Sequence, residues 1–311
     1  MISPYVRRQR LAVELQRLRD DAGLTHAELA KRIDESRMKI TRLENGRVIR
    51  DGQAVVMKVI DALGVTGERW TALMDMARDA TQRGWWASYG TAMGIRQSLY
   101  ADLEAGAAGI REFQPFIPGL LQTPEFAHHR QLAGPEIGPV TYQLERAVEA
   151  RQSRQRMLRR PDGPSYEVIL DEVAVRRLAA PPAVFAAQVE HLIGLAAEPR
   201  VEVRVLPVGA RIEGYVVPRS PFSIYDYPDT QDPRIVAVDT VTTNVVLNSM
   251  IETDQVARYA NRYDRLRRAT LTPEDSTAFL SVIATDSPTR STNQELSDAR
   301  VRTLAEVAVF E

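Results

Sequence analysis

The residues best suited to chemistry lie in one short segment near the start of the chain. Successive helical residues are rotated by about 100°, which divides residues 37–45 into two faces. Ile40 and Leu43 fall on one face, and the opposite face carries mainly cationic and hydrogen-bonding side chains: Arg37, Met38, Thr41, Arg42 and Asn45. Arginine can donate paired hydrogen bonds to guanine O6 and N7, and methionine can press on a thymine methyl group. The pattern predicts that the first four of these residues contact base edges in the major groove of DNA.

Residues that flank this face suit DNA phosphates better than bases. Side-chain cations and amides can bind the DNA backbone, and the free amides at a helix start can hold a phosphate. We expect phosphate contacts from five residues: Thr25, His26, Lys39, Asn45 and Arg47. Arg7, Arg8 and Arg10 form either an arm that reaches the DNA backbone or a solvated helix start. The plain alternative for the whole segment is a basic, solvated pair of helices.

Five short helices are expected between residue 8 and about residue 80, and the second and third position this face. Thr25 can cap the second helix, with Glu28 three positions later as in a capping box. Ala30 is small enough for the third helix to cross closely. Asp34 tolerates the left-handed backbone that the tight turn needs, and Ser36 can cap the third helix.

The segment AGLTHAELAKRIDESRMKITRLENG, residues 22–46, is similar to the lambda-repressor-like (XRE-type) family of helix-turn-helix regulators. The resemblance implies an ion pair between Arg19 and Glu44. It also implies a homodimer bound to a palindromic operator in double-stranded DNA, because one recognition helix buries too little surface for tight specific binding. The sequence departs from the family at Asp34, where glycine is commoner, and at His26, where glutamine is usual. Some members of the family keep this fold for protein contacts only.

The second part of the chain is expected to be an α+β domain. Four segments alternate like strands: 166–170, 201–206, 221–225 and 235–239. Helical patterns lie around them at 141–160, 171–178, 182–197, 252–268, 273–284 and 293–309. The sequence thus predicts an α+β protein: an all-α five-helix domain at 1–80, and at 81–285 a small, partly antiparallel sheet covered by helices, for sensing, partner binding and dimerisation. Residues 286–311 are expected to form a linker and a C-terminal helix.

This second part resembles the actinobacterial WhiJ-like, antitoxin-like transcriptional regulators. The order of several motifs carries the resemblance: Gly84-Trp85-Trp86, FQPFIPGLLQTPEFA at 113–127, VILDEVAVRR at 168–177 and YDRLRRATLTPEDS at 263–276. It implies a DNA-binding repressor whose C-terminal domain binds a small protein encoded by an adjacent gene, and it leaves room for a small-molecule effector. The alternative is an antitoxin that neutralises a small toxin and binds DNA for autoregulation.

Two pairs of residues could line a ligand or partner pocket in this domain. Trp85 and Trp86 could stack on a ligand, although two large aromatics at a domain junction more often pack the domains together. Leu120 and Leu121, between two prolines, could line a groove or pack in the core. The arginine-rich helix at 144–160 is expected to be a solvated face or an intramolecular ion-pair stripe, with a second nucleic-acid contact and a dock for an acidic partner as alternatives.

Charge and hydropathy indicate what kind of partner the protein binds and where it is located. The net charge is −1, but residues 1–66 hold about 13 Lys and Arg against 9 Asp and Glu, which leaves the remainder acidic. No apolar run approaches the ~20 residues of a membrane span. Residues 1–16 lack the apolar core of a secretion signal, so we expect a cytoplasmic protein.

No enzymatic chemistry is expected. Cysteine is absent, which excludes thiolate metal sites, and the sequence has no HExxH, phosphate-binding glycine loop or GxSxG motif. His128 and His129 are adjacent, so on a helix they diverge and cannot share a metal. The carboxylate pairs Asp171-Glu172 and Asp226/Asp229 lie where capping is the commoner role. We therefore expect no catalytic residue, no metal and no cofactor.

Overall fold

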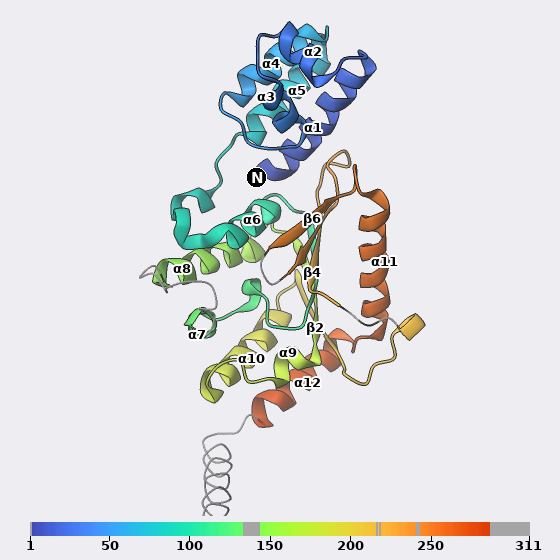
Figure 1. Cartoon of the computed structure of the whole chain (residues 1–311). Helices are drawn as coiled ribbons and strands as arrows, with labels where there is room; N and C mark the ends of the chain where they lie inside the picture. Colours follow the sequence, from blue (N-terminus) through green and yellow to red (C-terminus); the bar gives the residue numbers. More distant parts are fainter. Residues whose placement is uncertain (1, 133–143, 216, 218, 241–242, 287–311) are drawn as a thin grey trace, which may run out of the picture.

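The computed structural model describes residues 2–132, 144–215, 217, 219–240 and 243–286 (Figure 1). An N-terminal helical region precedes a C-terminal domain that combines helices with a mixed sheet, so the predicted α+β fold is confirmed. The helix predicted at 293–309 and all of the predicted linker beyond residue 286 lie outside the described residues.

The N-terminal region consists of α1 (Pro4–Asp21), α2 (His26–Arg32), α3 (Arg37–Glu44), α4 (Gly52–Ala62) and α5 (Gly67–Ala80). Helix α1 begins four residues earlier than predicted, because Ser3 accepts a hydrogen bond from the Val6 amide and Pro4 occupies the first helical turn. The five helices share a core of their own, in which the largest fully buried side chains are Leu15, Leu29, Ile40, Ile60 and Leu73.

The sheet of the C-terminal domain has six strands in the described residues, in the order β3-β2-β1-β4-β5-β6. They are β1 (Gly109–Gln114), β2 (Ser165–Asp171), β3 (Val201–Leu206), β4 (Phe222–Asp226), β5 (Ile235–Asp239) and β6 (Asn244–Asn248). Strands β1, β2 and β3 are parallel, and the pairs from β1 through β4 and β5 to β6 are antiparallel. Sequence patterning missed β1 and β6.

The central strand β1 escaped prediction because its sequence, GIREFQ, is half polar. Its side chains alternate between two apolar clusters, with Ile110 in one and Phe113 in the other. Glu112 and Gln114 share the face of Ile110 and are both buried. A buried strand with polar residues on an inner face lacks the simple alternation on which the prediction relies.

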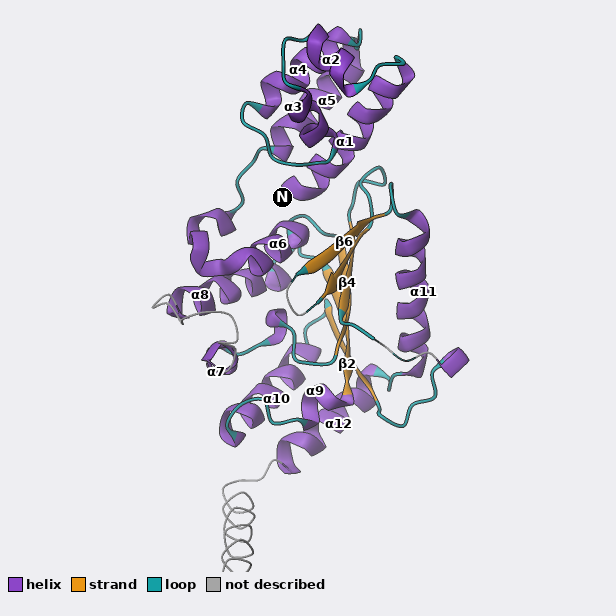
Figure 2. Cartoon of the chain, viewed as in Figure 1, coloured by secondary structure: helices purple, strands orange, loops and turns teal. Residues whose placement is uncertain are grey.

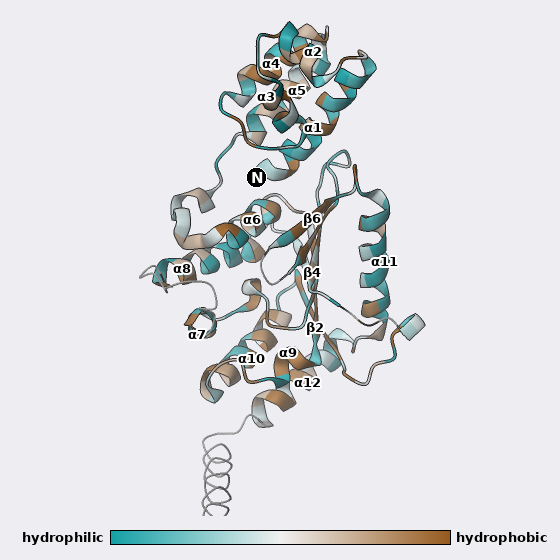
Figure 3. Cartoon of the chain, viewed as in Figure 1, coloured by the Kyte–Doolittle hydropathy of each residue, from teal (hydrophilic) through white to brown (hydrophobic). Residues whose placement is uncertain are grey.

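Helices cover both faces of the sheet (Figures 1 and 2). One face carries α11 (Thr253–Ala269), whose Val256, Tyr263 and Leu266 are buried against the strands. The other face carries most of the remaining helices: α6 (Gly94–Glu104), α7 (Pro124–Leu132), α8 (Leu144–Gln155), α9 (Glu172–Arg176), α10 (Pro182–Ala196) and α12 (Pro273–Asp286). Most of the α11 ribbon has the colour of hydrophilic residues in Figure 3, and the buried residues form one stripe.

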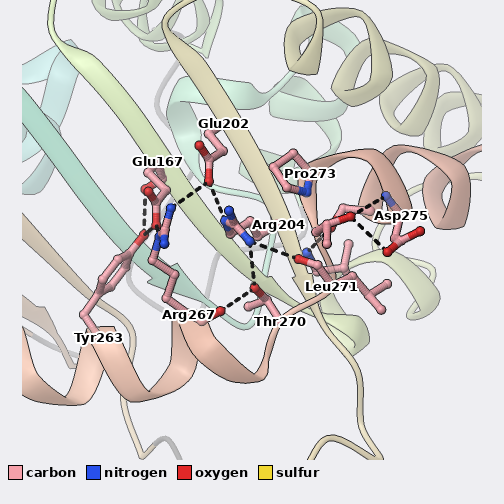
Figure 4. A network of polar contacts seen from close by, with 12 residues as sticks. Glu167, Glu202, Arg204, Tyr263, Arg267, Thr270, Leu271, Pro273 and Asp275 are labelled. Atoms are coloured by element: carbon pink, nitrogen blue, oxygen red, sulfur yellow. Dashed lines mark hydrogen bonds and ion pairs between the residues drawn. The ribbon is translucent and has the colours of Figure 1, made fainter.

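A polar network fixes the C-terminal end of α11 to the parallel strands (Figure 4). Tyr263 and Arg267 both donate to Glu167 Oε1 on β2, at 3.0 and 2.7 Å. Arg204 on β3 donates at 3.3 Å to the carbonyl of Leu271, in the turn that follows α11. The network thus holds the turn between α11 and α12 against the edge of the sheet.

The first turns of α1 join the two parts of the molecule. Val6 is 1% exposed and belongs to the same cluster as Leu103 on α6. Asp102, also on α6, accepts hydrogen bonds from the Tyr5 amide at 2.8 Å and from Arg8 at 3.2 Å. Helix α1 therefore packs on α6 by an apolar and a polar contact.

The predictions for Arg7, Arg8 and Arg10 were wrong: in the structure they form neither an arm nor a solvated helix start. Arg7 and Arg10 reach Asp232, in the loop between β4 and β5, at 3.0 and 3.1 Å, and Arg10 also reaches Asp229 at 2.6 Å. The side chains of Arg7 and Arg10 are only 13% and 11% exposed. The acidic loop was not recognised in the sequence as a partner because it is more than 200 residues away.

We expect Asp232→Ala to weaken the attachment of α1 to the body by about 1–3 kcal/mol, because two half-buried guanidinium groups lose a charged acceptor. Amide hydrogen exchange should then quicken in the first turns of α1 and in α6. Glu213→Ala, which removes the exposed partner of Arg268, is the matched control and should leave this exchange unchanged. Equal protection of α1 in wild type and Asp232→Ala would show that these ion pairs do not hold the junction.

Candidate nucleic-acid interface

Helices α2 and α3 form the predicted helix-turn-helix. Thr25 and Glu28 form the expected capping box: the Thr25 hydroxyl accepts from the Glu28 amide, and the Glu28 carboxylate accepts from the Thr25 amide. Ala30 is 3% exposed at the crossing of the two helices. Asp34 has a φ of 52°, the left-handed conformation expected for the tight turn. Local sequence thus determines the angle at which α3 leaves α2.

Helix α3 has one buried and one exposed face, in the predicted orientation. Ile40 is fully buried and Leu43 is 8% exposed, whereas Met38 is 68% exposed. Arg37 and Arg42 are exposed beside Met38. Arg37 has no hydrogen-bond or ion-pair partner in the part of the chain that the structure describes, and Arg42 donates to the carbonyl of Val48 at 3.2 Å. The exposed face can therefore present two guanidinium groups and a thioether to a groove.

A buried ion pair fixes α3 to α1. Arg19 Nε lies 2.8 Å from Glu44 Oε1, and its Nη2 lies 2.9 Å from Oε2. The side chains of Arg19 and Glu44 are only 8% and 4% exposed. The hydrogen bonds to Glu44 raise the pKa of Arg19. This pair, which the family resemblance implied, orients the recognition helix through contacts that bidentate arginine–carboxylate geometry favours.

The phosphate candidates differ in their freedom to bind a ligand. His26 Nε2 lies 3.0 Å from Glu44 Oε2, which places His26 in the buried network. Lys39 is paired with Glu35 at 2.7 Å, and Asn45 donates to the carbonyl of Thr41 at 2.6 Å. Arg47 is exposed next to this surface. Among the candidate cations that flank α3, Arg47 is the better placed for a phosphate.

The body of the protein leaves the exposed face of α3 open. The hydrogen bonds and ion pairs that connect the two parts of the described chain come mainly from the first turns of α1, at residues 3–10. Figure 1 shows α1 at the junction, with α2 and α4 at the far end of the helical region. Arg37 and Arg42 are therefore not held against the larger domain.

The pocket predicted from Trp85, Trp86, Leu120 and Leu121 does not exist as one site. Trp85 and Trp86 meet edge to face, with ring centroids 6.0 Å apart, and pack in a small cluster with α6 and α8. Leu120 and Leu121 are 2% and 0% exposed in the main core, and Leu120 also lines a cleft of the C-terminal domain, as predicted for a groove. The two pairs fall in different clusters because the intervening chain forms β1, which the sequence analysis did not recognise. The tryptophans pack within the C-terminal body, and they do not join it to the helical region.

The arginine-rich helix α8 contributes one buried ion pair. Arg154 donates two hydrogen bonds to Glu104 of α6, one of them 3.0 Å long, and the two side chains are 7% and 2% exposed. The ion pair predicted within the molecule is therefore present at one arginine of this helix, and it is buried. Arg151, one turn earlier, donates to the side chain of Gln122 at 2.6 Å and lines a cleft.

This cleft, of about 680 Å³, is the site that the sequence analysis missed. It lies at the carboxyl ends of β1 and β2, between α6, α7, α8 and α9. Its polar lining includes Arg96, Gln97, Tyr100, Glu112, Gln114, Arg130, Arg151, Arg177 and Asp239. The available signals were the polar residues of GIREFQ and the arginines of α8, but they become one site only through the parallel pairing of β1 with β2.

The carboxylate pairs named in the sequence have structural roles. Asp171 caps α9 by accepting from the Val173 amide at 3.0 Å, as expected for capping. Asp226 accepts from Arg111 and Arg234. Among the described residues, no helix is long and apolar enough to cross a membrane, and no cluster of His, Asp and Glu could hold a metal ion.

The fold and the open face of α3 define a DNA-binding transcription regulator of the helix-turn-helix class, and residues 10–73 match the family model described as "Helix-turn-helix domain". Residues 97–282 match the model described as "Domain of unknown function (DUF5753)", and the chain belongs to this family. No curated protein and no solved structure matches the chain. The WhiJ-like resemblance is not tested by these matches and stays a prediction.

Proposed function

We propose that this regulator is a dimeric repressor that reads its operator with the exposed face of α3. The observation that carries the proposal is the division of α3, with Ile40 sealed in the core and Arg37, Met38 and Arg42 turned outward. Arg37 and Arg42 would donate to guanine edges, while Met38 and Thr41 would contact thymine methyl groups or neighbouring bases. The basic charge of residues 1–66 supports the same surface.

Dimerisation would place two such helices on a palindromic operator, about one helical turn apart. An eight-residue recognition helix gives few base contacts by itself, so two half-sites are needed for specific affinity. Arg47, at the end of α3, and the amides at the start of α2 would fix the register by binding phosphates.

The C-terminal domain would modulate DNA binding by binding a partner, either a small protein encoded next to it or a small-molecule effector. We propose binding rather than catalysis, because the described lining of the large cleft includes no histidine, serine, threonine or lysine, and its two carboxylates, Glu112 and Asp239, already accept hydrogen bonds within the protein. No contact among the described residues favours the antitoxin alternative over a regulator. Co-expression with the adjacent small gene separates them, because an antitoxin would relieve toxicity and a regulator would change only transcription.

We expect Arg42→Ala to lower affinity for the operator by about 1–3 kcal/mol and to flatten base preference at one position, because a bidentate base contact is lost. Arg47→Ala should instead weaken binding to all DNA sequences about equally. It should also reduce by about one the slope of log affinity against log salt concentration. The operator is first obtained by genome-wide DNA capture with the purified chain, and affinities are then measured by fluorescence anisotropy across a salt series.

Arg159→Ala is the control for this measurement, since it removes an exposed arginine of the body outside the helix-turn-helix. It should leave both operator affinity and salt slope unchanged. The proposed docking is wrong if Arg42→Ala binds the operator as tightly as wild type does. Light scattering of the complex, which should contain two chains per operator, tests dimerisation separately.

A further inference from the structure

The large cleft occupies a position that favours ligand binding. In open sheets with parallel strands, ligands bind outside the carboxyl ends of the strands. Here β1, β2 and β3 are parallel, so their carboxyl ends share one edge of the sheet. The cleft lies at the carboxyl end of β1, and its volume of about 680 Å³ is in the range of small-molecule sites.

Positive charge exceeds negative charge around the cleft. The lining contains five arginines, at 96, 130, 151, 154 and 177, against two carboxylates, Glu112 and Asp239. Glu104 neutralises Arg154. The side chains of Arg130 and Arg177 have no hydrogen-bond or ion-pair partner among the described residues, although both residues line the cleft. Several positive charges are therefore left to face the cavity.

Three of the six buried polar side-chain atoms without a hydrogen-bond partner in the described chain belong to residues of this cleft. They are Oε1 of Gln97, Oε1 of Gln114 and Nε of Arg151. Gln114 is only 4% exposed and comes from the central strand. Leaving such atoms unpaired is costly, so water or a bound molecule in the cleft must supply the missing partners.

The lowered pKa of Arg151 indicates that no negative charge in the described chain lies close enough to balance this guanidinium group. Burial lowers the pKa of Arg151 to about 10, and the nearby charges of Arg154 and Arg130 act in the same direction. An anion placed among these guanidinium groups would reverse both effects, because it favours the charged form and supplies hydrogen-bond acceptors.

Helix α6 connects the cleft to the helix-turn-helix. Gln97 and Tyr100 line the cleft, and Tyr100 donates to Asp239, another lining residue. On the same helix, Asp102 accepts from the Tyr5 amide and from Arg8 of α1. A shift of α6 on filling the cleft would therefore act directly on the helix that positions α3.

We propose that the cleft is an effector site for a small polar organic dianion, a molecule with a phosphate monoester or two carboxylates. Arg130, Arg151 and Arg177 bind the anionic group, and Gln97 and Gln114 bind its neutral polar part. Guanidinium forks match the oxygens of both anionic groups, and two negative charges balance the excess of arginines. The effector role rests on the proposed function, whereas binding of the anion does not.

Thermal unfolding of the full chain tests binding. The probes are glucose 6-phosphate, inorganic phosphate and succinate, compared with glucose and with sodium chloride at matched ionic strength. At ten times its Kd, an organic dianion should raise Tm by about 3 °C or more, in a saturable manner. The site is refuted if neither glucose 6-phosphate nor succinate exceeds sodium chloride, or if glucose stabilises as much as glucose 6-phosphate.

Variants locate the effect. Arg177→Ala removes an exposed lining residue without a partner and should abolish most of the shift without disturbing the fold. Arg151→Met, which removes a buried guanidinium group of the lining, should also abolish most of the Tm shift. Arg159→Ala, an exposed arginine outside the cleft, and Arg42→Ala, on the DNA-binding face, should keep the full shift. Retention of the shift in both Arg177→Ala and Arg151→Met would assign the anion to another surface and overturn the proposal.

The effector role is tested on the operator. The dianion that stabilises most should change operator affinity about fivefold or more, and Arg177→Ala should remove this change. Stabilisation without a change in affinity would overturn the effector role while leaving the binding site in place. If the chain binds no operator at all, the proposed DNA function fails, and the unfolding assay still decides whether the cleft binds anions.

Discussion

Replacing Glu104 with alanine is expected to lower the free energy of unfolding by about 3–5 kcal/mol, because it leaves Arg154 charged and buried without its counter-ion. Both side chains are almost completely buried, and Arg154 donates two hydrogen bonds to the Glu104 carboxylate. Burial alone would lower the pKa of Arg154, but the charge of Glu104 outweighs it and the pKa is raised. In the variant this counter-charge is gone, and the guanidinium stays ionised because arginine does not lose its proton in proteins. Denaturant unfolding followed by far-ultraviolet circular dichroism measures the loss.

The double variant Glu104→Leu/Arg154→Met is the control for that experiment. It removes both charges and fills similar volume, so it should recover most of the stability. Glu213→Ala, which breaks an exposed pair, should leave the unfolding curve unchanged. If Glu104→Ala alone unfolds at the wild-type denaturant concentration, the buried pair does not stabilise the fold as expected.

Replacing Glu112 with glutamine is expected to remove a pH dependence of stability between about pH 4.5 and 7. Burial raises the pKa of Glu112 to about 7, the Glu104 charge acts in the same direction, and hydrogen bonds from Tyr166 and Ser223 oppose both. Below pH 4.5 the carboxyl is protonated in both the folded and the unfolded states. As pH rises, the unfolded chain loses the proton first, so wild-type stability falls by a total of about 3 kcal/mol until the folded group also ionises near pH 7.

Glutamine keeps the shape of protonated glutamate and carries no proton that titrates in this range. The variant should therefore be more stable than wild type above pH 7 and nearly equal to it below pH 4.5. Urea unfolding from pH 4 to pH 8 measures the difference, in buffers without phosphate or dicarboxylates so that the cleft stays unliganded. Parallel stability curves for wild type and Glu112→Gln would contradict a raised pKa at this residue.

The helix-turn-helix was predictable from sequence because its signals are local. The capping box at Thr25 and Glu28, the left-handed turn at Asp34 and the two faces of α3 each depend on residues within about one helical turn or one tight turn. Each was found in the structure within a residue or two of its expected place. The family resemblance added the one longer contact, between Arg19 and Glu44.

The C-terminal domain was harder to predict because its central strand and its cleft depend on non-local pairing. Strand β1 is polar on an inner face, so its periodicity does not mark it as a strand. Leu120 and Leu121 were expected either in a groove or in the core, and only the packing of α8 and α10 around their loop places both in the core, with Leu120 also lining the cleft. The helix predicted at 144–160 contains six arginines, and the sequence could not show which of them form ion pairs inside the molecule.

The sequence by itself determined the α+β class, the five N-terminal helices and the side of α3 that meets solvent, since these follow from periodicity and capping over a few residues. Tertiary structure alone decided that Arg7 and Arg10 bind an acidic loop and that Arg154 is neutralised by Glu104. It also gathered Gln97, Gln114 and Arg151 around one cleft. The physical reason is that the environment of a charge, and hence its partner and its cost of burial, is set by groups that lie near it in space, often far away in the chain.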